Sequence, residues 1–290
     1  MILFKKTSDL KRWLDQERSS GKTIGFVPTM GALHEGHISL IDISKKSSSL
    51  TVCSIFVNPT QFNDPKDFQK YPVTLEKDIV LLEKAGVDVL FLPGADEVYP
   101  DGTSHLEKYD LGRLETILEG KYRPGHFQGV CQVMRRLLQL VSPDDLFMGA
   151  KDYQQCMVVQ RLIDLMGWSI RLHRCPIVRE ADGLAMSSRN VRLTPDERQR
   201  ATAIYKALKS VKTHWGDVLA DEIAIAGEAV LSRVLTEALQ FLADAQFRID
   251  YVEVADAITL EPVEAGASNA VVLIAAFQGE VRLIDNMILS

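Results

Sequence analysis

Short apolar runs alternate with amphipathic segments over the first 176 residues of the chain. Ile38, Leu40, Ile41 and Ile43 share one helical face, so a helix is expected to begin near His37. The same patterning predicts strands at residues 23–27, 50–57, 87–92, 146–148 and 169–178, and further helices at residues 74–85, 130–141 and 152–166. Strands separated by helices indicate a parallel sheet with right-handed crossovers. The predicted fold class is therefore α/β.

The pattern changes after residue 176. Residues 194–198 predict the opening of a helix, with Pro195 at an early position. Residues 222–242 are strongly helical, and strands are expected at residues 249–254, 270–276 and 281–284. Because 290 residues is long for one compact domain, we expect two. They are residues 1–176, built on a Rossmann-like parallel sheet, and residues 177–290, a smaller α+β domain.

The composition is that of an ordinary soluble protein, with 46% hydrophobic and 25% charged residues. No apolar run is long enough to cross a bilayer, and the first residues lack the apolar core of a secretory signal. Cys53, Cys131, Cys156 and Cys175 are widely spaced and form no metal-binding pattern. We therefore expect free thiols, no membrane partner and a cytoplasmic location.

The charge is unevenly distributed along the chain. The net charge of −6 argues against a nucleic-acid partner. Residues 1–176 carry 22 basic and 22 acidic side chains, whereas residues 177–290 carry 11 and 17. The first part can therefore accommodate an anionic substrate more easily than the second.

Residues 28–37, with the sequence PTMGALHEGH, lie between the first expected strand and the first expected helix. A strand, a glycine-bearing turn and a helix start form a phosphate-binding arrangement, in which the first helical N–H groups point at the anion. His34 and His37 are three residues apart and project from one side of that turn. Each can donate a hydrogen bond to phosphate, and either can be cationic near neutral pH. This pattern favours a phosphate site over two structural histidines.

Further polar stretches follow later strands, at residues 58–62, 149–155 and 179–190. Ligands of parallel sheets bind beyond the carboxyl ends of the strands, so these loops and the first turn could build one polyphosphate site. Lys151 opposes the dipole of the helix that it precedes, which favours an anion in front of it.

Structural alternatives remain for several of these loop residues. The pair Asn58-Pro59 is common in turns, so Asn58 could simply shape a turn. Asp152 could cap the following helix, and residues 187–189 could be a plain polar loop. Residues 120–127 are rich in turn formers, and Arg123 and His126 could either reach over the site or face water.

The glycine turn is neither a Walker loop nor a dinucleotide fingerprint. Its H-x-G-H pattern resembles the nucleotidyltransferase superfamily, to which class I aminoacyl-tRNA synthetases belong. Within it, the blocks PTMGALHEGH, FVNPTQF, RPGHFQGV, KDYQQ, READGLAMSSRN and RLIDN resemble the pantothenate synthetase family, the pantoate–β-alanine ligases, from about Lys22 to Asn286.

Four positions depart from the usual pattern of that family. Val73 and Ala150 stand where the family has arginine and glutamate, and Met148 and Arg192 stand where it has phenylalanine and tyrosine. None removes a residue to which the resemblance gives a catalytic role, and Ala150 lies inside an expected nucleotide loop.

The resemblance implies an ATP-dependent ligase that makes pantothenate in two steps. The carboxylate of (R)-pantoate attacks the α-phosphorus of ATP to give pantoyl adenylate and pyrophosphate, and the amine of β-alanine then displaces AMP. It also implies Mg²⁺ with ATP, although the metal ligands are not indicated, and a homodimer. The first domain would bind ATP and pantoate, and the second would be a lid whose MSSRN loop closes on ATP.

The resemblance assigns residues to these roles. His37 would be the proton donor or charge stabiliser, acting with His34 and Lys151. Gln61 and Gln155 would bind the substrates pantoate and β-alanine, with Asn58 orienting the same region. The implied ATP site comprises Met30, Gly31, Ala32, Leu33, His34, Glu35, Gly36, His37, Gly149, Ala150, Lys151, Asp152, Val178, Met186, Ser187, Ser188 and Arg189.

Two other functions stay open at this point. A nucleotidylyltransferase would keep the adenylyl group on its product and would need a basic site for a phosphorylated acceptor, which Gln61 and Gln155 do not provide. A non-catalytic nucleotide-binding module would bind ATP without turnover, and would give no reason for both histidines and Lys151.

Overall fold

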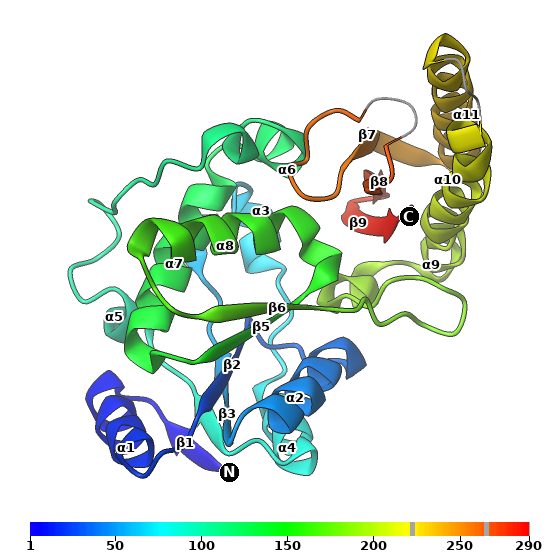
Figure 1. Cartoon of the computed structure of the whole chain (residues 1–290). Coiled ribbons are helices and arrows are strands. Elements are labelled where there is room, and N and C mark those ends of the chain that lie inside the picture. The colour runs from blue at the N-terminus through cyan, green and yellow to red at the C-terminus, as the bar shows by residue number, and fades with distance from the viewer. Residues whose placement is uncertain (221–223, 264–266, 290) are drawn as a thin grey trace. The chain divides into compact units, whose positions relative to one another are not determined.

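The computed structural model describes residues 1–220, 224–263 and 267–289. The chain divides into two compact units, Met1–Val178 (unit 1) and Arg179–Ser290 (unit 2) (Figure 1). The boundary expected from the sequence lay two residues earlier, after residue 176. Within the described residues, no helix combines the length and apolar character needed to cross a membrane.

Unit 1 is built on a six-stranded sheet in the order β1-β4-β3-β2-β5-β6, and every neighbouring pair is parallel. The strands are β1 Ile2–Phe4, β2 Ile24–Thr29, β3 Leu50–Ile55, β4 Val89–Phe91, β5 Asp145–Gly149 and β6 Arg171–Cys175. The four central strands are almost wholly buried, because helices cover both faces of the sheet. The predicted α/β class with a parallel sheet is confirmed.

Two layers of helices enclose this sheet. The helices are α1 Thr7–Ser19, α2 Glu35–Ser47, α3 Pro65–Gln69, α4 Leu75–Ala85, α5 Ala95–Val98, α6 Leu118–Tyr122, α7 His126–Val141 and α8 Tyr153–Met166, with 3₁₀ turns η1 Pro59–Gln61, η2 Gly112–Glu115 and η3 Ala150–Asp152. Alternate residues of a strand point to opposite faces. Phe26 therefore joins the core formed with α1, α7 and α8, whereas Val27 joins the core formed with α2 and α4.

Several element bounds differ from the sequence-based prediction. The strand expected at residues 50–57 ends at Ile55, ahead of the Asn58-Pro59 turn. The helix expected from residue 130 begins at His126, because Gly125 takes a left-handed conformation (φ 80°) and starts the helix there. The strand expected at residues 169–178 spans only Arg171–Cys175. Strand β1 and helix α1 were not predicted.

Unit 2 packs helices against a three-stranded antiparallel sheet in the order β7-β8-β9. Its elements are η4 Ser188–Arg192, α9 Pro195–Ala201, α10 Ala203–Ala220, α11 Ala224–Asp244, β7 Phe247–Asp256, β8 Ala270–Gln278 and β9 Val281–Ile288. Thr194 and Glu197 form a capping box at the start of α9, with Pro195 as its first residue. The predicted α+β character is confirmed. The helix expected from Glu222 is seen from Ala224, since Glu222 lies outside the described residues.

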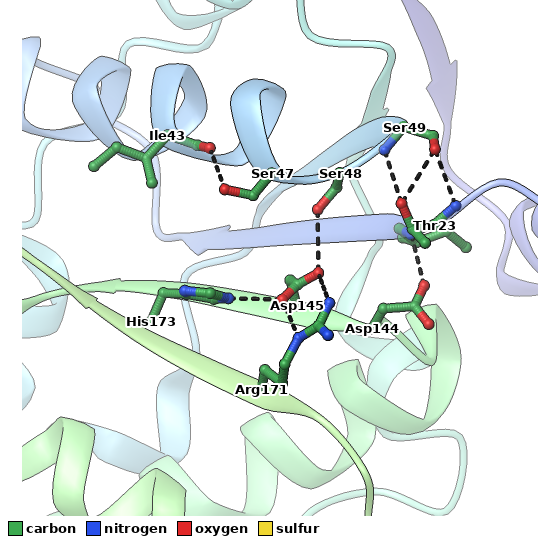
Figure 2. Close-up of polar contacts among 10 residues, drawn as sticks. Thr23, Ile43, Ser47, Ser48, Ser49, Asp144, Asp145, Arg171 and His173 are labelled. Carbon is green, nitrogen blue, oxygen red and sulfur yellow. Dashed lines mark hydrogen bonds and ion pairs between the residues drawn. The ribbon is translucent and has the colours of Figure 1, made fainter.

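The amino edge of the parallel sheet is held by an ion pair and by hydrogen bonds (Figure 2). Asp145, at the start of β5, accepts two hydrogen bonds of 2.8 Å from the Arg171 guanidinium and pairs with His173 Nε2 at 2.6 Å. Neighbouring Asp144 accepts from the Ile24 N–H at 2.7 Å. These contacts join β5 to the edge strand β6 and to β2. The polar groups at this edge therefore stabilise the pairing of the strands.

Candidate functional site

The loop that follows β2 is shaped by a buried carboxylate. Gly31 and Ala32 take left-handed conformations, with φ of 81° and 50°. Asp78, in the first turn of α4 and only 1% exposed, accepts from Ala32 N–H and Leu33 N–H, both at 2.9 Å. Thr74 Oγ1 donates to the same carboxylate at 3.0 Å. Asp78 therefore holds two successive backbone donors and fixes the path of the loop.

The two histidines cap helix α2. His34 is the N-cap residue and its Nδ1 accepts from Gly36 N–H, while His37 Nδ1 accepts from His34 N–H, each at 3.2 Å. The His37 N–H bonds to the His34 carbonyl at 2.8 Å. We expected the first helical N–H groups to point at an anion. That expectation is wrong for Gly36 and His37, because both donors turn inward to complete the cap.

The cap determines which nitrogen of each ring can meet a ligand. A ring nitrogen that accepts a hydrogen bond carries no proton, so the proton of each neutral ring is on Nε2. The two rings lie with centroids 4.1 Å apart. His34 and His37 together therefore offer two adjacent Nε2–H donors.

Both imidazoles are neutral in the free protein at pH 7. The pKa of His34 is lowered from 6.5 to about 4, chiefly by burial and also by the positive charge of Lys151, while Asp152 acts in the opposite direction. The pKa of His37 is lowered to about 3, again chiefly by burial and also by His34 and Lys151. The expectation that either ring is cationic near neutral pH is therefore wrong for the free protein.

Residues 150–152 follow β5, which is the neighbour of β2 in the sheet, so they and the loop after β2 lie at the same edge. The charge of Lys151 influences the pKa of both histidines, and that of Asp152 influences the pKa of His34. Asp152 occupies the N-cap position of α8, but its side chain makes no capping hydrogen bond within the described residues. The alternative that Asp152 is a simple helix cap is therefore not supported.

Asn58 and Gln61 follow β3 and belong to one hydrogen-bonded group. Asn58 is 1% exposed, and its Nδ2 donates to Gln61 Oε1 at 3.0 Å and to the Gly129 carbonyl at 3.1 Å. Gln61 Nε2 reaches Met30 Sδ at 3.3 Å, which joins this group to the loop after β2. Asn58 therefore supports Gln61 from the protein interior.

Two neighbouring glutamines at the start of α8 have different surroundings. Gln154 is buried, accepts from Glu119 N–H at 3.0 Å and donates to the carbonyls of Leu114 and Ile117 at 2.8 and 3.0 Å. Gln155 is half-buried. Gln154 is thus a structural residue, and Gln155 stays the predicted substrate ligand of the pair.

The turn-rich segment at residues 120–127 packs against the Gln61 segment. His126 is buried and its Nδ1 lies 2.8 Å from the Gln61 carbonyl oxygen. Arg123 forms an ion pair with Glu119 at 3.5 Å. The alternative that His126 faces water is therefore wrong.

Two residues that shape the site were missed in the sequence. Asp78 lies three residues after Leu75 and four before Leu82, on the apolar face of its helix, and a carboxylate at such a position is a usable signal. Tyr99, which donates to Asn58 Oδ1 at 2.8 Å, follows the short helix α5 and gave no comparable signal.

Residues 186–189 belong to unit 2, and Val178 is the last residue of unit 1. Ser187 Oγ accepts from Arg189 N–H at 3.2 Å and begins the turn η4. The hairpin before this loop is anchored by Arg179, whose guanidinium bonds both oxygens of the buried Asp285 at 2.6 and 3.0 Å. Arg179 of the READG block and Asp285 of the RLIDN block thus form one bidentate ion pair.

The described residues contain no group of three or more His, Cys, Asp or Glu side chains arranged to hold a metal ion. Mg²⁺ in nucleotide sites is commonly bound through substrate phosphates with only one or two protein carboxylates. A magnesium ion bound in that way would need no such group of side chains.

Comparisons with known proteins cover both units. A sequence profile of the family described as pantoate-beta-alanine ligase matches residues 2–288. The pantothenate synthetase of Thermotoga petrophila is 42% identical over 100% of both chains, and that of Aquifex aeolicus is 42% identical over 98% of both.

Solved structures give the same result. A pantothenate synthetase from Thermus thermophilus is 38% identical with a TM-score of 0.89, covering 100% of this chain and 99% of that one. A pantoate-beta-alanine ligase from Francisella tularensis, complexed with beta-gamma ATP and beta-alanine, is 35% identical with a TM-score of 0.80, covering 100% and 98%.

Proposed function

The chain belongs to the pantoate-beta-alanine ligase family, and on that premise we propose that it joins (R)-pantoate to β-alanine through a pantoyl adenylate, releasing AMP and pyrophosphate. One observation carries the proposal, namely that the family match runs over residues 2–288 and so includes both units. The relative from Francisella tularensis, which was solved with an ATP ligand and beta-alanine, supports the same substrates.

Adenylate formation requires positioning of the triphosphate and neutralisation of the charge on departing pyrophosphate. The paired Nε2–H groups of His34 and His37 are donors for phosphate oxygens that need no change of protonation state. Lys151 supplies the positive charge on the adjacent loop. We assign His37 to stabilisation of the leaving pyrophosphate, with His34 and Lys151 beside it.

The remaining nucleotide contacts are assigned by family resemblance. They fall to residues 30–36, to residues 149–152 with Val178, and to residues 186–189 of unit 2. In this assignment unit 2 acts as a lid, and its MSSRN loop contributes Ser187, Ser188 and Arg189 to the phosphates. Exclusion of water by such a lid protects an adenylate that water can hydrolyse.

Gln61 and Gln155 are assigned to pantoate, and the contact of Gln61 with Met30 supports a place beside the nucleotide loop. A neutral amide can orient the carboxylate without forming an ion pair, so the carboxylate stays nucleophilic. β-Alanine would then attack from the same region once the adenylate has formed.

We also propose that ATP acts as its Mg²⁺ complex, and that the enzyme is a cytoplasmic homodimer. All four cysteines are buried free thiols, which suits a reducing compartment. Light scattering after size-exclusion chromatography tests the dimer, which predicts twice the chain mass of 32.4 kDa.

A product assay tests the proposed reaction. ATP, pantoate, β-alanine and Mg²⁺ are combined, and each is omitted in turn. AMP, pyrophosphate and pantothenate should form in equal amounts, and only in the complete mixture. Formation of ADP and phosphate would exclude the adenylate, and an adenylyl group retained on the product would indicate a nucleotidylyltransferase.

A further inference from the structure

Two hydrogen bonds link Tyr99 to Gln61: the Tyr99 hydroxyl donates to the Asn58 side chain, and the Asn58 side chain donates to Gln61. We propose that Tyr99, acting through Asn58, fixes the orientation of the Gln61 side-chain amide so that Gln61 meets pantoate as a hydrogen-bond donor. The inference rests on the proposed function in assigning Gln61 to pantoate. It makes Tyr99 a positioning residue with no contact of its own to the substrate.

Backbone groups settle the orientation of the Asn58 amide. The Gly129 carbonyl can only accept, so the Asn58 nitrogen faces it, at 3.1 Å. The Thr60 N–H can only donate, so the Asn58 oxygen faces it, at 3.4 Å. Of the hydrogen bonds that this oxygen accepts from Tyr99 and Thr60, the bond from the Tyr99 hydroxyl is the shortest, at 2.8 Å.

The orientation of Asn58 then sets that of Gln61. Asn58 Nδ2 donates to the Gln61 side chain at 3.0 Å, so the atom of Gln61 that faces it must be the acceptor Oε1. The amide nitrogen of Gln61 therefore lies on the other side, where Nε2 is 3.3 Å from Met30 Sδ. Gln61 thus presents N–H groups towards the nucleotide loop, which matches the oxygens of a hydroxy acid.

Tyr99 is suited to this role by its surroundings. It is 5% exposed and packs against Phe56, with ring centroids 6.3 Å apart. Its hydroxyl is protonated at neutral pH and can donate, and burial raises its pKa further. Thr60 Oγ1 is a second and longer donor to the same Asn58 oxygen, at 3.1 Å, although its single proton can also go to the Gly129 carbonyl at 3.4 Å. Removal of the Tyr99 hydroxyl therefore weakens the hold on Asn58 without abolishing it.

The first test compares two tyrosine-to-phenylalanine variants. Tyr99→Phe should raise KM for pantoate by about threefold to tenfold, the effect of one neutral hydrogen bond, and leave KM for ATP unchanged. Tyr109→Phe is the matched control, since its hydroxyl accepts from Arg135 at 3.2 Å in the same apolar core. It should leave KM for pantoate unchanged. A rise in KM for both substrates in Tyr99→Phe would overturn the proposal.

A double-mutant cycle separates positioning from general support. Gln61→Met has no amide to orient, so adding Tyr99→Phe to it should cause no further loss of pantoate affinity, measured by calorimetric titration. Equal losses in the two backgrounds would contradict a positioning role for Tyr99. Thr60→Val repeats the test if Tyr99→Phe fails to fold, with a smaller effect in the same direction. A failure of the proposed function appears separately, as wild-type enzyme that makes no pantoate-dependent AMP.

Discussion

Two carboxylates that are each 1% exposed lie at opposite ends of the strands in unit 1, Asp145 at the amino ends and Asp78 beside the carboxyl ends. The two carboxylates have different partners. Asp145, at the amino edge, pairs with the side chains of Arg171 and His173 (Figure 2). Asp78, beside the carboxyl edge, accepts from the backbone N–H groups of Ala32 and Leu33. Equal burial therefore does not imply an equal role.

The partners explain the difference. Arg171 and His173 are themselves on strand β6, so the Asp145 ion pairs join two strands and contribute to stability. Their side chains are 69% and 38% exposed, and solvent screening keeps that contribution modest. The partners of Asp78 belong to a loop with two consecutive left-handed residues. Asp78 therefore determines the shape of the loop that we assign to ATP, and a change there should affect the kinetics with ATP more than folding.

The largest expected effect is at the carboxyl edge itself. Lys151→Met keeps much of the side-chain length and removes its charge, so the rate of adenylate formation should fall by about 10²–10³. Chemically supplied pantoyl adenylate should still react with β-alanine at close to the wild-type rate, because pyrophosphate has already left. Single-turnover rates of the two half-reactions provide the measurement. Comparable losses in both would mean that Lys151 holds the adenylate or supports the loop.

The next prediction compares the two carboxylates directly. Asp78→Asn replaces one acceptor oxygen by an NH₂ group that faces a backbone N–H, so the loop is displaced. A shift of about 1 Å can cost on the order of 100-fold in rate, and kcat/KM for ATP should fall by about that factor. Steady-state kinetics with ATP as the varied substrate measures it.

Asp145→Asn is the matched control for Asp78→Asn. It loses ion pairs at the opposite edge, so Tm should fall by a few degrees, at about 2–4 °C per kcal/mol for a domain of this size. The kcat/KM for ATP should not change. If Asp145→Asn lost activity as severely as Asp78→Asn, the two edges would not differ in the way that their contacts indicate.

A smaller effect is expected for the two glutamines that we assign to pantoate. Gln61→Ala and Gln155→Ala should each raise the pantoate requirement about tenfold or more, since a hydrogen bond to a charged group contributes about 1.5–3 kcal/mol. ATP binding should barely change. If either variant lost ATP affinity and kept pantoate affinity, the assignment of that amide to pantoate would be wrong.

The last prediction concerns the histidine cap, where activity at neutral pH is not altered and only the response to acid is measured. The unfolded chain protonates these histidines near pH 6.5, whereas the folded chain does so only near pH 4 for His34 and pH 3 for His37. Their contribution to stability is therefore present above pH 6.5 and is lost as pH falls through about 4 for His34 and about 3 for His37. Titration of the imidazole signals by NMR should show both rings neutral, with the proton on Nε2, down to pH 5. A midpoint near 6.5 for either ring would contradict the cap.

The strands and helices of unit 1 were largely predictable because apolar spacing follows directly from the burial of a central parallel sheet. Strand β1 was not, since Ile2–Phe4 is a largely exposed edge strand whose three apolar residues are too few to show a period. The start of α7 was misplaced, because the turn-forming residues up to Gly125 concealed the first turn, although Phe127 lies three and four residues before Val130 and Cys131 and shares their apolar face.

The sequence was enough to predict which loops form the candidate site, but not which hydrogen bonds their residues make. The spacing of His34 and His37 places them on one side of a turn, but does not reveal that their Nδ1 atoms accept from the backbone. Asp78 bonds to residues 45 and 46 positions earlier in the chain, and that pairing depends on how α4 packs against α2, the helix that follows the loop. Long-range hydrogen bonds of this kind leave no local pattern.

Amide hydrogen exchange at Ala32 and Leu33 tests most directly whether Asp78 holds the nucleotide loop. In Asp78→Asn, exchange at these two amides should accelerate by roughly tenfold to a hundredfold, the effect of losing about 1–3 kcal/mol of hydrogen bonding. In Asp145→Asn, local exchange at the same amides should stay at the wild-type rate. Unchanged exchange in Asp78→Asn, or equal acceleration in both variants, would contradict the distinction between the two carboxylates.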